Sequence, residues 1–515
     1  MSNVKIGWYE VNITPDKKVS LYGQFAERIS EYVEKPLTAT AMAVESCGDQ
    51  AVIIGCDLVE IQKFLVDAIR ENLKDNQEGL DPEKIVIGAI HTHTGPSYHD
   101  SRQNKAGSDL FGEMLDAVRP YMKPGQKYVQ AAEITGNPEV ATDQENCDML
   151  VERISEAALG AWKNRKPASF KNGFDRAAVG MCRRVDYSDG TAQMWGESNT
   201  AVFTEMEGGS DSGVELLYTF DEAGKLTGAM VNVCCPAQCV QHRLFVSPDF
   251  WGETKKLLRE KFGPDFYMLP TCSTAGDQCP VDLVRWVNPD TDVHDPNLIR
   301  HNPPVRKADP SMFDLEGMRK AGKRVANAVI DGFEGVQNDA AQEEIKFIHH
   351  VHNMQLPLRR ATLTERDNAI KAIREYIQSR DGDLNYMDVG NLQVHAGILQ
   401  RFKLQETCNI MESEVHVIRM GSVAIASFPM EVYLDYGNQI KARQLCEQSF
   451  LIQLANGSME YLPTEKAEKH GHYSAFIGSS WVGHEGGELM VRQTLKDINS
   501  MFADDYKTYS YPDEG

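Results

Sequence analysis

The 515-residue chain lacks the features that mark several protein classes. Its eleven cysteines contain no C-x-x-C pair, which argues against zinc-finger and thioredoxin-like sites. No apolar run is long enough to span a bilayer, and the first residues lack the basic segment and apolar core of a secretion signal. Basic residues are outnumbered by acidic ones, 53 to 75, so the net charge is −22. That balance argues against partners such as nucleic acid or an anionic membrane surface.

What the chain does contain is typical of a globular protein. Hydrophobic residues make up 42 % of the sequence and charged residues 25 %, which is an ordinary globular profile. Because no export signal is visible, we expect a cytoplasmic location with reduced thiols. The expected partner is a small-molecule substrate. The sequence leaves the oligomeric state open, including a homo-oligomer.

Short apolar strands alternate with amphipathic helices along the chain. Strands are predicted at 51–59, 84–90 and 266–269, hairpins over 216–233 and 415–428, and helices over 60–75, 148–164, 314–333, 364–380 and 488–501. This alternation predicts an α/β fold in which helices cover mixed β-sheets. Since no linker or repeat is visible, we expect a single large catalytic domain over residues 1–505 and a loose tail over 506–515.

Two histidines stand at the end of one predicted strand. His91 and His93 directly follow the apolar run 84–90, and a Gly-Pro turn comes after them. Residues two apart on a strand share a face, so both imidazoles can bind one metal ion, or a metal and a substrate together. An isolated pair of this kind is a weak motif, and its simplest interpretation is one surface histidine beside one capping histidine.

Four other segments share the pattern of an apolar run followed by a polar loop with a reactive side chain. They carry Cys235, Asp277 with Cys279, Glu431, and Tyr461. Enzymes with α/β folds place their sites where strand ends converge at one edge of a sheet. We therefore expect these side chains and the two histidines to gather around a shared ion.

In these segments the sequence resembles the neutral/alkaline ceramidase family, amidases that use one zinc ion. Five stretches carry the resemblance, in the family's order over nearly the whole chain. Residues 7–16 are similar to its opening segment, His91-Thr-His93-Thr-Gly-Pro96 to its HTHSGP motif, and Gly276-Asp277-Gln-Cys279-Pro280 to its GDxSP motif. Pro429-Met-Glu431 falls where the family has a ligand glutamate, and Tyr461-Leu-Pro-Thr464 with the later Tyr473 is similar to its GYVTT segment and a following tyrosine. The resemblance implies a ceramidase-like catalytic domain. The family's C-terminal immunoglobulin-like domain has no visible counterpart.

The resemblance also implies a role for each matching residue. The implied Zn²⁺ ligands are His91, Cys235, Glu431 and Tyr461. His93 would contact the substrate or transition state, and Tyr473 would be a second tyrosine of the site. Arg183 would steady the nucleophile, and the neighbouring Arg184 matches the family's arginine nearly as well.

Two positions depart from the family's pattern. Cys235 stands where the family has its second histidine ligand, and Cys279 stands where it has its nucleophilic serine. A thiolate is a good zinc ligand, and a thiol is a stronger nucleophile than a serine when its pKa is lowered. Three alternatives stay open: Cys279 attacks the substrate, Cys279 binds the ion instead, or the metal is lost or replaced.

The reaction implied by the resemblance is hydrolysis of an amide (N-acyl) or related linkage through a tetrahedral intermediate. We expect a soluble substrate rather than ceramide, because ceramide is membrane-bound and the chain shows no anchor. Asp277 would orient its loop or act as a base, unless it only stabilises the turn after Gly276. The alternatives are a glycoside-cleaving enzyme with Asp277 and Glu431 as paired carboxylates, and a degenerate site that only binds a ligand.

Overall fold

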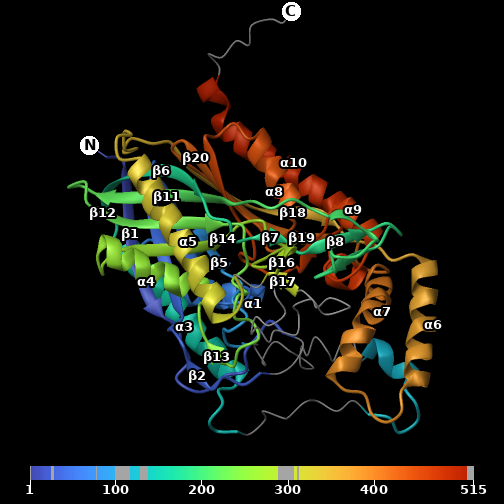
Figure 1. Cartoon of the computed structure of the whole chain (residues 1–515). Helices are drawn as coiled ribbons and strands as arrows, with labels where there is room; N and C mark the ends of the chain where they lie inside the picture. Colours follow the sequence, from blue (N-terminus) through green and yellow to red (C-terminus); the bar gives the residue numbers. More distant parts are fainter. Residues whose placement is uncertain are drawn as a thin grey trace, which may run out of the picture.

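The computed structural model describes residues 2–24, 28–76, 78–98, 116–127, 137–287, 307–309 and 312–506. The predicted C-terminal tail lies outside the described residues from residue 507 on. Figure 1 shows a body of sheets flanked by helices, from which α6 (Leu363–Ser379) and α7 (Tyr386–Leu404) extend to one side. None of the described helices combines the length and the apolar character that a membrane span requires.

The largest sheet has eight strands in the order β14-β12-β11-β6-β1-β3-β4-β5. The strands are β1 (Val4–Asn12), β3 (Thr38–Ser46), β4 (Asp49–Cys56), β5 (Ile85–Ala89), β6 (Lys166–Arg176), β11 (Gly213–Asp221), β12 (Leu226–Val233) and β14 (Tyr267–Cys272). Among the described residues, its two four-stranded halves are joined by strand pairing where β1 pairs with β6, through Lys5 with Pro167 and Ile6 with Lys166. The outermost pairs, β4–β5 and β12–β14, are parallel.

A second sheet has four strands in the order β18-β19-β20-β22. They are β18 (Phe347–Pro357), β19 (Ile410–Met420), β20 (Val423–Ser427) and β22 (Gln448–Ile452). Its inner face packs against both halves of the large sheet, because Ile425 and Phe450 share one buried cluster with Trp8 and Met230. The β19–β20 hairpin turns at Gly421, whose φ of 59° suits glycine, where the sequence predicts the turn.

Smaller two- and three-stranded sheets form within the segments that connect these strands. They contain β2 (Tyr32–Val33), β7 (Met181–Cys182), β8 (Arg184–Tyr187), β9 (Ala192–Met194), β10 (Phe203–Met206), β13 (Phe245–Val246), β15 (Gln278–Cys279), β16 (Asp282–Val287), β17 (Lys307–Asp309), β21 (Glu431–Val432) and β23 (Tyr461–Leu462). Two of them matter most for the site, since β21 pairs with β23 and β15 pairs with β7.

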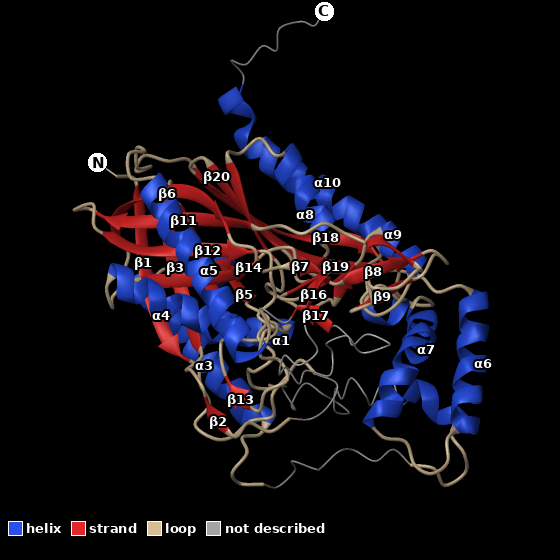
Figure 2. Cartoon of the chain, in the orientation of Figure 1, coloured by secondary structure: helices blue, strands red, loops and turns tan. Residues whose placement is uncertain are grey.

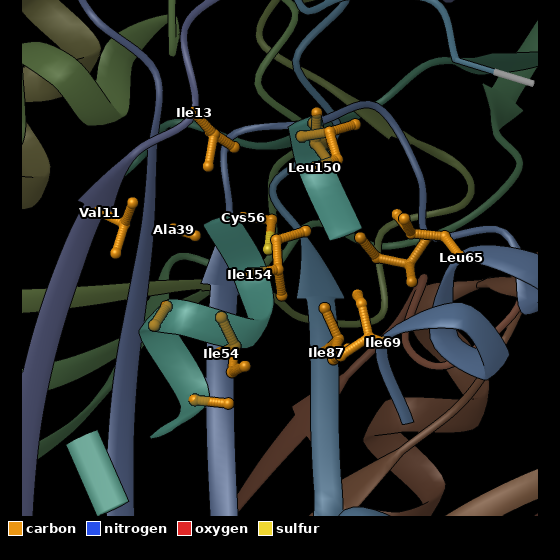
Figure 3. Close-up of a cluster of buried hydrophobic side chains, with 14 of the residues drawn as sticks. Val11, Ile13, Ala39, Ile54, Cys56, Leu65, Ile69, Ile87, Leu150 and Ile154 are labelled. Carbon is orange, nitrogen blue, oxygen red and sulfur yellow. The ribbon is translucent and has the colours of Figure 1, made fainter. Parts of the chain in front are cut away.

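Most of the described helices lie on the outer faces of the sheets, whereas α6 and α7 pack against each other beside them. The described α-helices are α1 (Lys63–Leu73), α3 (Asp143–Lys163), α4 (Phe250–Phe262), α5 (Asp314–Gly335), α6 (Leu363–Ser379), α7 (Tyr386–Leu404), α8 (Leu434–Arg443), α9 (Glu465–His470) and α10 (His484–Phe502). Figure 3 shows side chains of α1, α3, β4 and β5 pointing toward one another in one buried cluster. Helices α4 and α5 pack on the other half of the large sheet, and α8 and α10 pack on the four-stranded sheet. Figure 2 shows this layering, which confirms the predicted α/β class with helix-covered mixed sheets.

Two helices begin earlier than the periodicity of apolar residues predicts. Helix α3 begins at Asp143, because Thr142 and Glu145 form a capping box before its first buried turn. Helix α10 begins at His484, and its first turn includes Gly486 and Gly487. Glycine disfavours helix in isolation, but a Cβ on Gly487 would lie 2.4 Å from the Tyr436 ring, so close packing accounts for glycine there.

Two half-buried ion contacts join α4 to strand β1. Lys255 Nζ lies 2.9 Å from Glu10 Oε2, and Arg259 Nη2 lies 2.9 Å from Glu10 Oε1. Burial alone raises the pKa of Glu10, but the two cations outweigh it and lower this pKa from 4.5 to about 2.

Replacing Glu10 by glutamine is expected to lower the free energy of unfolding by roughly 3 kcal/mol at pH 7, the linkage equivalent of such a pKa shift. The folded pKa lies below the unfolded one, so this stabilisation is fully present above about pH 4.5 and is lost as the pH falls toward 2. Urea unfolding of wild type and variant at pH 7 and pH 3 measures it. If wild type and variant differ in free energy of unfolding by the same amount at both pH values, the expectation is contradicted.

Candidate active site

Backbone hydrogen bonds bring five distant segments of the chain together where their strands end. The bonds run from Ala237 N to Ile90 O (3.2 Å), from Asn456 N to Ile87 O (3.0 Å), from Ser273 N to Val233 O (2.9 Å), from Gly276 N to Val432 O (2.9 Å) and from Glu431 N to Glu460 O (2.8 Å). Each bond links two of the loops in which the sequence shows a reactive side chain. The loops after β5, β12, β14, β20 and β22 therefore form one continuous region.

His91 lies at the centre of this region in an unusual conformation. It is buried, and its φ of 67° is in the left-handed region, where a bulky residue is strained. Its Nδ1 lies 2.7 Å from the carbonyl oxygen of Val59, which therefore accepts the Nδ1 proton. The other ring nitrogen, Nε2, lies 3.4 Å from Glu431 Oε2 and 3.2 Å from His93 Nε2. Metal-binding histidines commonly have one ring nitrogen tied to a backbone carbonyl in this way, which orients the other nitrogen toward the ion.

Glu431 and Tyr461 lie side by side because the short strands β21 and β23 are parallel with these two residues in register. The Tyr461 hydroxyl donates a hydrogen bond to the Glu431 carboxylate. Arg183 approaches from the other side, where its Nη2 donates to the Tyr461 hydroxyl at 3.2 Å and to the carbonyl of Gly276 at 2.8 Å. An imidazole, a carboxylate and a phenol thus converge, with a guanidinium behind the phenol.

Burial controls the charge of these groups. It raises the pKa of Glu431, against the opposing effects of His91 and Arg183. Burial together with the neighbouring Glu431 raises the pKa of Tyr461 well above 10. Burial lowers the pKa of Arg183, but Tyr461 and Glu431 raise it by more, so the guanidinium stays charged. A further positive charge at this point would stabilise both acids in their anionic forms.

His93 lies beside His91 and is held by two glutamines. Its Nε2 lies 2.8 Å from Gln238 Nε2 and 3.2 Å from His91 Nε2, and its Nδ1 lies 3.4 Å from Gln24 Nε2. Burial, with a smaller contribution from His91, lowers the pKa of His93 well below 6.5. The ring is therefore neutral at pH 7, with one nitrogen that donates and one that accepts.

Tyr473 completes the group from the loop after α9. Its ring lies edge-on to that of Tyr461, with centroids 5.7 Å apart, and the two hydroxyls are hydrogen-bonded. Burial raises the pKa of Tyr473 to about 12, so its hydroxyl keeps its proton at neutral pH. The structure therefore brings together the predicted residues His91, His93, Arg183, Glu431, Tyr461 and Tyr473, which we call the site group.

The two cysteines that depart from the ceramidase pattern face backbone carbonyls instead. Cys235 Sγ lies 3.4 Å from the carbonyl oxygens of both Val179 and Pro236, inside an apolar cluster. Cys279 Sγ lies 3.6 Å from the carbonyl of Val281. Burial raises the pKa of Cys235 well above 9 and that of Cys279 to about 12, so both thiols are neutral at pH 7. Their roles as metal ligand and nucleophile stay predictions.

Asp277 is used at a helix end. Its Oδ1 accepts the backbone N–H of Leu434, the first residue of α8, at 2.9 Å. A carboxylate at a helix N-terminus stabilises the unpaired N–H groups there. Burial raises the pKa of Asp277. This contact corresponds to the structural interpretation of Asp277, and a base role stays a prediction.

A different trio has the right spacing for a cation among the residues that the structure describes. One ligand atom each of Asp186, Glu207 and His470 lie within 4.8 Å of one another. Among the described residues, His91, Cys235 and Glu431 do not form such a group. Two cations already compensate the trio, because Arg184 pairs with Glu207 at 2.6 Å and Lys466 pairs with Asp186 at 2.9 Å.

Sequence reasoning missed four polar residues of this region. Gln24 and Gln238 contact His93, and Glu60 and Glu460 influence Glu431 electrostatically. Burial raises the pKa of Glu460 to about 8, a kind of perturbation that is frequent at functional sites. The only available signal was position, since Glu460 directly precedes Tyr461 and Gln238 follows Cys235 by three residues.

Comparison with known proteins reveals a likeness in structure only. No protein-family model and no curated protein sequence matches the chain. The neutral ceramidase from Pseudomonas aeruginosa has a TM-score of 0.63 and 15 % identity, over 99 % of this chain and 76 % of that chain. A ceramidase complexed with C2 has a TM-score of 0.64 and 13 % identity, over 99 % and 77 % of the two chains. The predicted ceramidase-like fold is confirmed, and family membership stays a prediction.

Proposed function

We propose that the protein is a metal-dependent hydrolase that cleaves an amide (N-acyl) bond in a small polar molecule. One observation carries the proposal: His91 Nε2, the Glu431 carboxylate and the Tyr461 hydroxyl converge at the ends of strands from different parts of the chain, with His91 and Glu431 3.4 Å apart. The likeness to ceramidases, which hydrolyse an amide, supports this reading of the site.

The three donors fit a zinc ion by their chemistry. Imidazole nitrogen and carboxylate oxygen are common ligands of zinc, and catalytic zinc sites use three protein ligands and keep a position open. Burial opposes the anionic forms of Glu431 and Tyr461, and a bound cation would remove that penalty. Such an ion supplies Lewis acidity that polarises a carbonyl and acidifies water. We therefore propose His91, Glu431 and Tyr461 as the ligands, without Cys235.

The remaining members of the site group would act on the substrate directly. His93 is neutral and Tyr473 keeps its proton, so each can donate a hydrogen bond to the oxyanion of a tetrahedral intermediate. Arg183 would fix the Tyr461 oxygen through the bond from its Nη2. Together they provide two donors for the developing negative charge and one fixed cation behind it.

We propose water, rather than the Cys279 thiol, as the attacking group. A thiol attacks as its thiolate, and a pKa of about 12 leaves almost no thiolate at pH 7. Arg183 lowers this pKa, but the effect of burial is larger. The Cys279 Sγ also points to the carbonyl of Val281 within an apolar cluster.

The surroundings of His93 favour a polar substrate. A molecule that reaches this imidazole meets the amide side chains of Gln24 and Gln238, and Gln24 in turn contacts Gln241 at 3.0 Å. Amides provide both donors and acceptors, which suits hydroxyl or amide groups better than alkyl chains. The acids Glu60 and Glu460 add further polarity near Glu431.

The test is a panel of soluble N-acyl amino acids, N-acyl amino sugars and short-chain ceramides, with metal content measured on protein purified without chelators. We expect about one zinc per chain and turnover of at least one polar amide, lost on chelation and restored by Zn²⁺. Mass spectrometry of quenched enzyme should show no acyl adduct. An adduct on Cys279 would contradict water attack, and active protein free of metal would contradict the metal site.

The glycoside-cleaving alternative is less well supported. It requires Asp277 as one of two carboxylates, but Asp277 Oδ1 already accepts the N–H of Leu434. Including aryl glycosides in the same panel tests this alternative, and binding of an amide without turnover would indicate the degenerate site.

A further inference from the structure

The loop that carries Tyr473 has a strained backbone. Gly471, His472 and Ser474 have φ values of 73°, 73° and 69°. Two of these three are not glycine, and a non-glycine residue in the left-handed region costs on the order of 1 kcal/mol or more. Tyr473 therefore lies between residues that would relax elsewhere unless the surrounding protein held them.

Side-chain contacts hold this loop at each residue around Tyr473. His470 Nδ1 lies 3.1 Å from Asp186 Oδ1. His472 Nδ1 accepts the backbone N–H of Met194 at 3.1 Å. The Ser474 and Tyr433 hydroxyls are 2.7 Å apart. The backbone N–H groups of Ala475 and Phe476 also donate to the carbonyl of His472, and one further residue reaches the carbonyls on either side of it.

That residue is Arg184, which is fully buried at the start of β8. Its Nη2 donates to the carbonyl of Gly471 at 2.7 Å, and its Nη1 donates to the carbonyl of Tyr473 at 2.8 Å. Glu207 accepts from its Nε at 2.6 Å and from its Nη2 at 3.0 Å, a two-point pairing that fixes the plane of the guanidinium. The orientation of Arg184 therefore sets the position of the Tyr473 backbone.

Two consecutive arginines thus hold the two tyrosines of the site. Arg183 donates to the hydroxyl of Tyr461, whereas Arg184 donates to the main chain of Tyr473. The sequence does not separate these arginines, but their contacts do. Adjacent residues of the chain thus contact both tyrosines, in addition to the β21–β23 pairing that places Tyr461.

We propose that Arg184, oriented by Glu207, is a positioning residue that sets the Tyr473 hydroxyl against Tyr461. The consequence for catalysis rests on the proposed function, whereas the positioning itself does not. Lysine cannot replace Arg184, because one ammonium on a flexible stem cannot hold two carbonyls and a carboxylate in a fixed plane.

The test uses 3-fluorotyrosine at position 473 of the full chain, so that ¹⁹F NMR reports on the phenol without any assay of turnover. We expect one narrow resonance, which shifts and broadens in Arg184→Lys. Arg419→Lys is the matched control. Arg419 is also buried and donates to the carbonyl of Met501. None of its contacts among the described residues reaches the loop of Tyr473. The control variant should lose stability while leaving the resonance unchanged.

The same variants give a kinetic test once a substrate is found. Arg184→Lys should lower kcat/KM by about 10-fold to 10²-fold, as misplacement of a positioned group does, and should do so mainly through kcat. In a Tyr473→Phe background the same change should have almost no further effect. A structural role alone would lower kcat/KM equally in both backgrounds, and that result would overturn the proposal.

An unchanged ¹⁹F resonance in Arg184→Lys would also overturn it. A shifted resonance in an enzyme that hydrolyses nothing on the panel would support the positioning and count against the proposed function instead. If Arg184→Lys does not fold, Glu207→Gln provides the same readout, because it removes the charge that orients the guanidinium and should shift the resonance in the same direction.

Discussion

Replacing Glu431 by glutamine is expected to lower turnover on the order of 10³-fold and to release the bound metal while the chain stays folded. The Glu431 carboxylate lies 3.4 Å from His91 Nε2 and accepts the Tyr461 hydroxyl. Glutamine keeps the shape of the side chain but removes the negative charge, so the two remaining donors hold a cation much less tightly. Metal content by atomic emission and turnover on the best amide substrate are the measurements.

Glu215→Gln provides the matched control for this experiment. Glu215 lies in strand β11, outside the site group, and is also buried. Its carboxylate pairs with the Lys441 ammonium at 2.9 Å. This variant should lose some stability and keep both its metal and its turnover. Loss of turnover in Glu431→Gln with full metal retention would contradict the ligand role and favour a general acid or base at Glu431.

Replacing Gly276 by alanine is expected to lower kcat/KM by about 10²-fold through geometry alone. A Cβ at Gly276 would lie 2.4 Å from the carbonyl oxygen and 2.8 Å from the carbonyl carbon of Glu431, closer than real atoms approach. Strand β21 must therefore move away, and Glu431 moves with it relative to His91. We also expect the free energy of unfolding to fall by about 1–3 kcal/mol, as for other overpacked sites.

Gly335→Ala is the control for that change. It adds the same methyl group where no atom lies within 4 Å, so stability and turnover should both stay close to wild type. If Gly276→Ala has a wild-type kcat/KM, the loop that contains Gly276 does not determine the position of strand β21 as the structure indicates. Thermal unfolding and steady-state kinetics on both variants decide the matter.

The elements that the sequence predicts well are those with strong local signals. The strand that ends before His91, the hairpin at Gly421 and the long helix from Asp314 all follow from apolar periodicity and turn residues. The pairing of β1 with β6 involves two residue pairs and joins the halves of the large sheet. No local pattern encodes such a contact, because it depends on the packing of distant segments.

The site was predictable to the extent that it follows strand ends and motif order. The resemblance located His91, Glu431, Tyr461 and Tyr473, and the structure brings these residues together. It could not reveal that Cys235 points to Val179, because side-chain direction depends on packing. The glutamines around His93 have no periodic or motif signal, and only coordinates identify them.

The meeting of five distant loops has a consequence for when the site group can assemble. The residues that meet there are distant in sequence, since Asn456 bonds to Ile87 and Glu431 faces His91. Contacts of such long range form slowly and late, after local hairpins and helices have collapsed. Before the ribosome adds the residues beyond Ile452, the emerging polypeptide can complete its first sheets but lacks Tyr461 and Tyr473 of the site group. The site group can therefore assemble only after Tyr473 has been added to the chain.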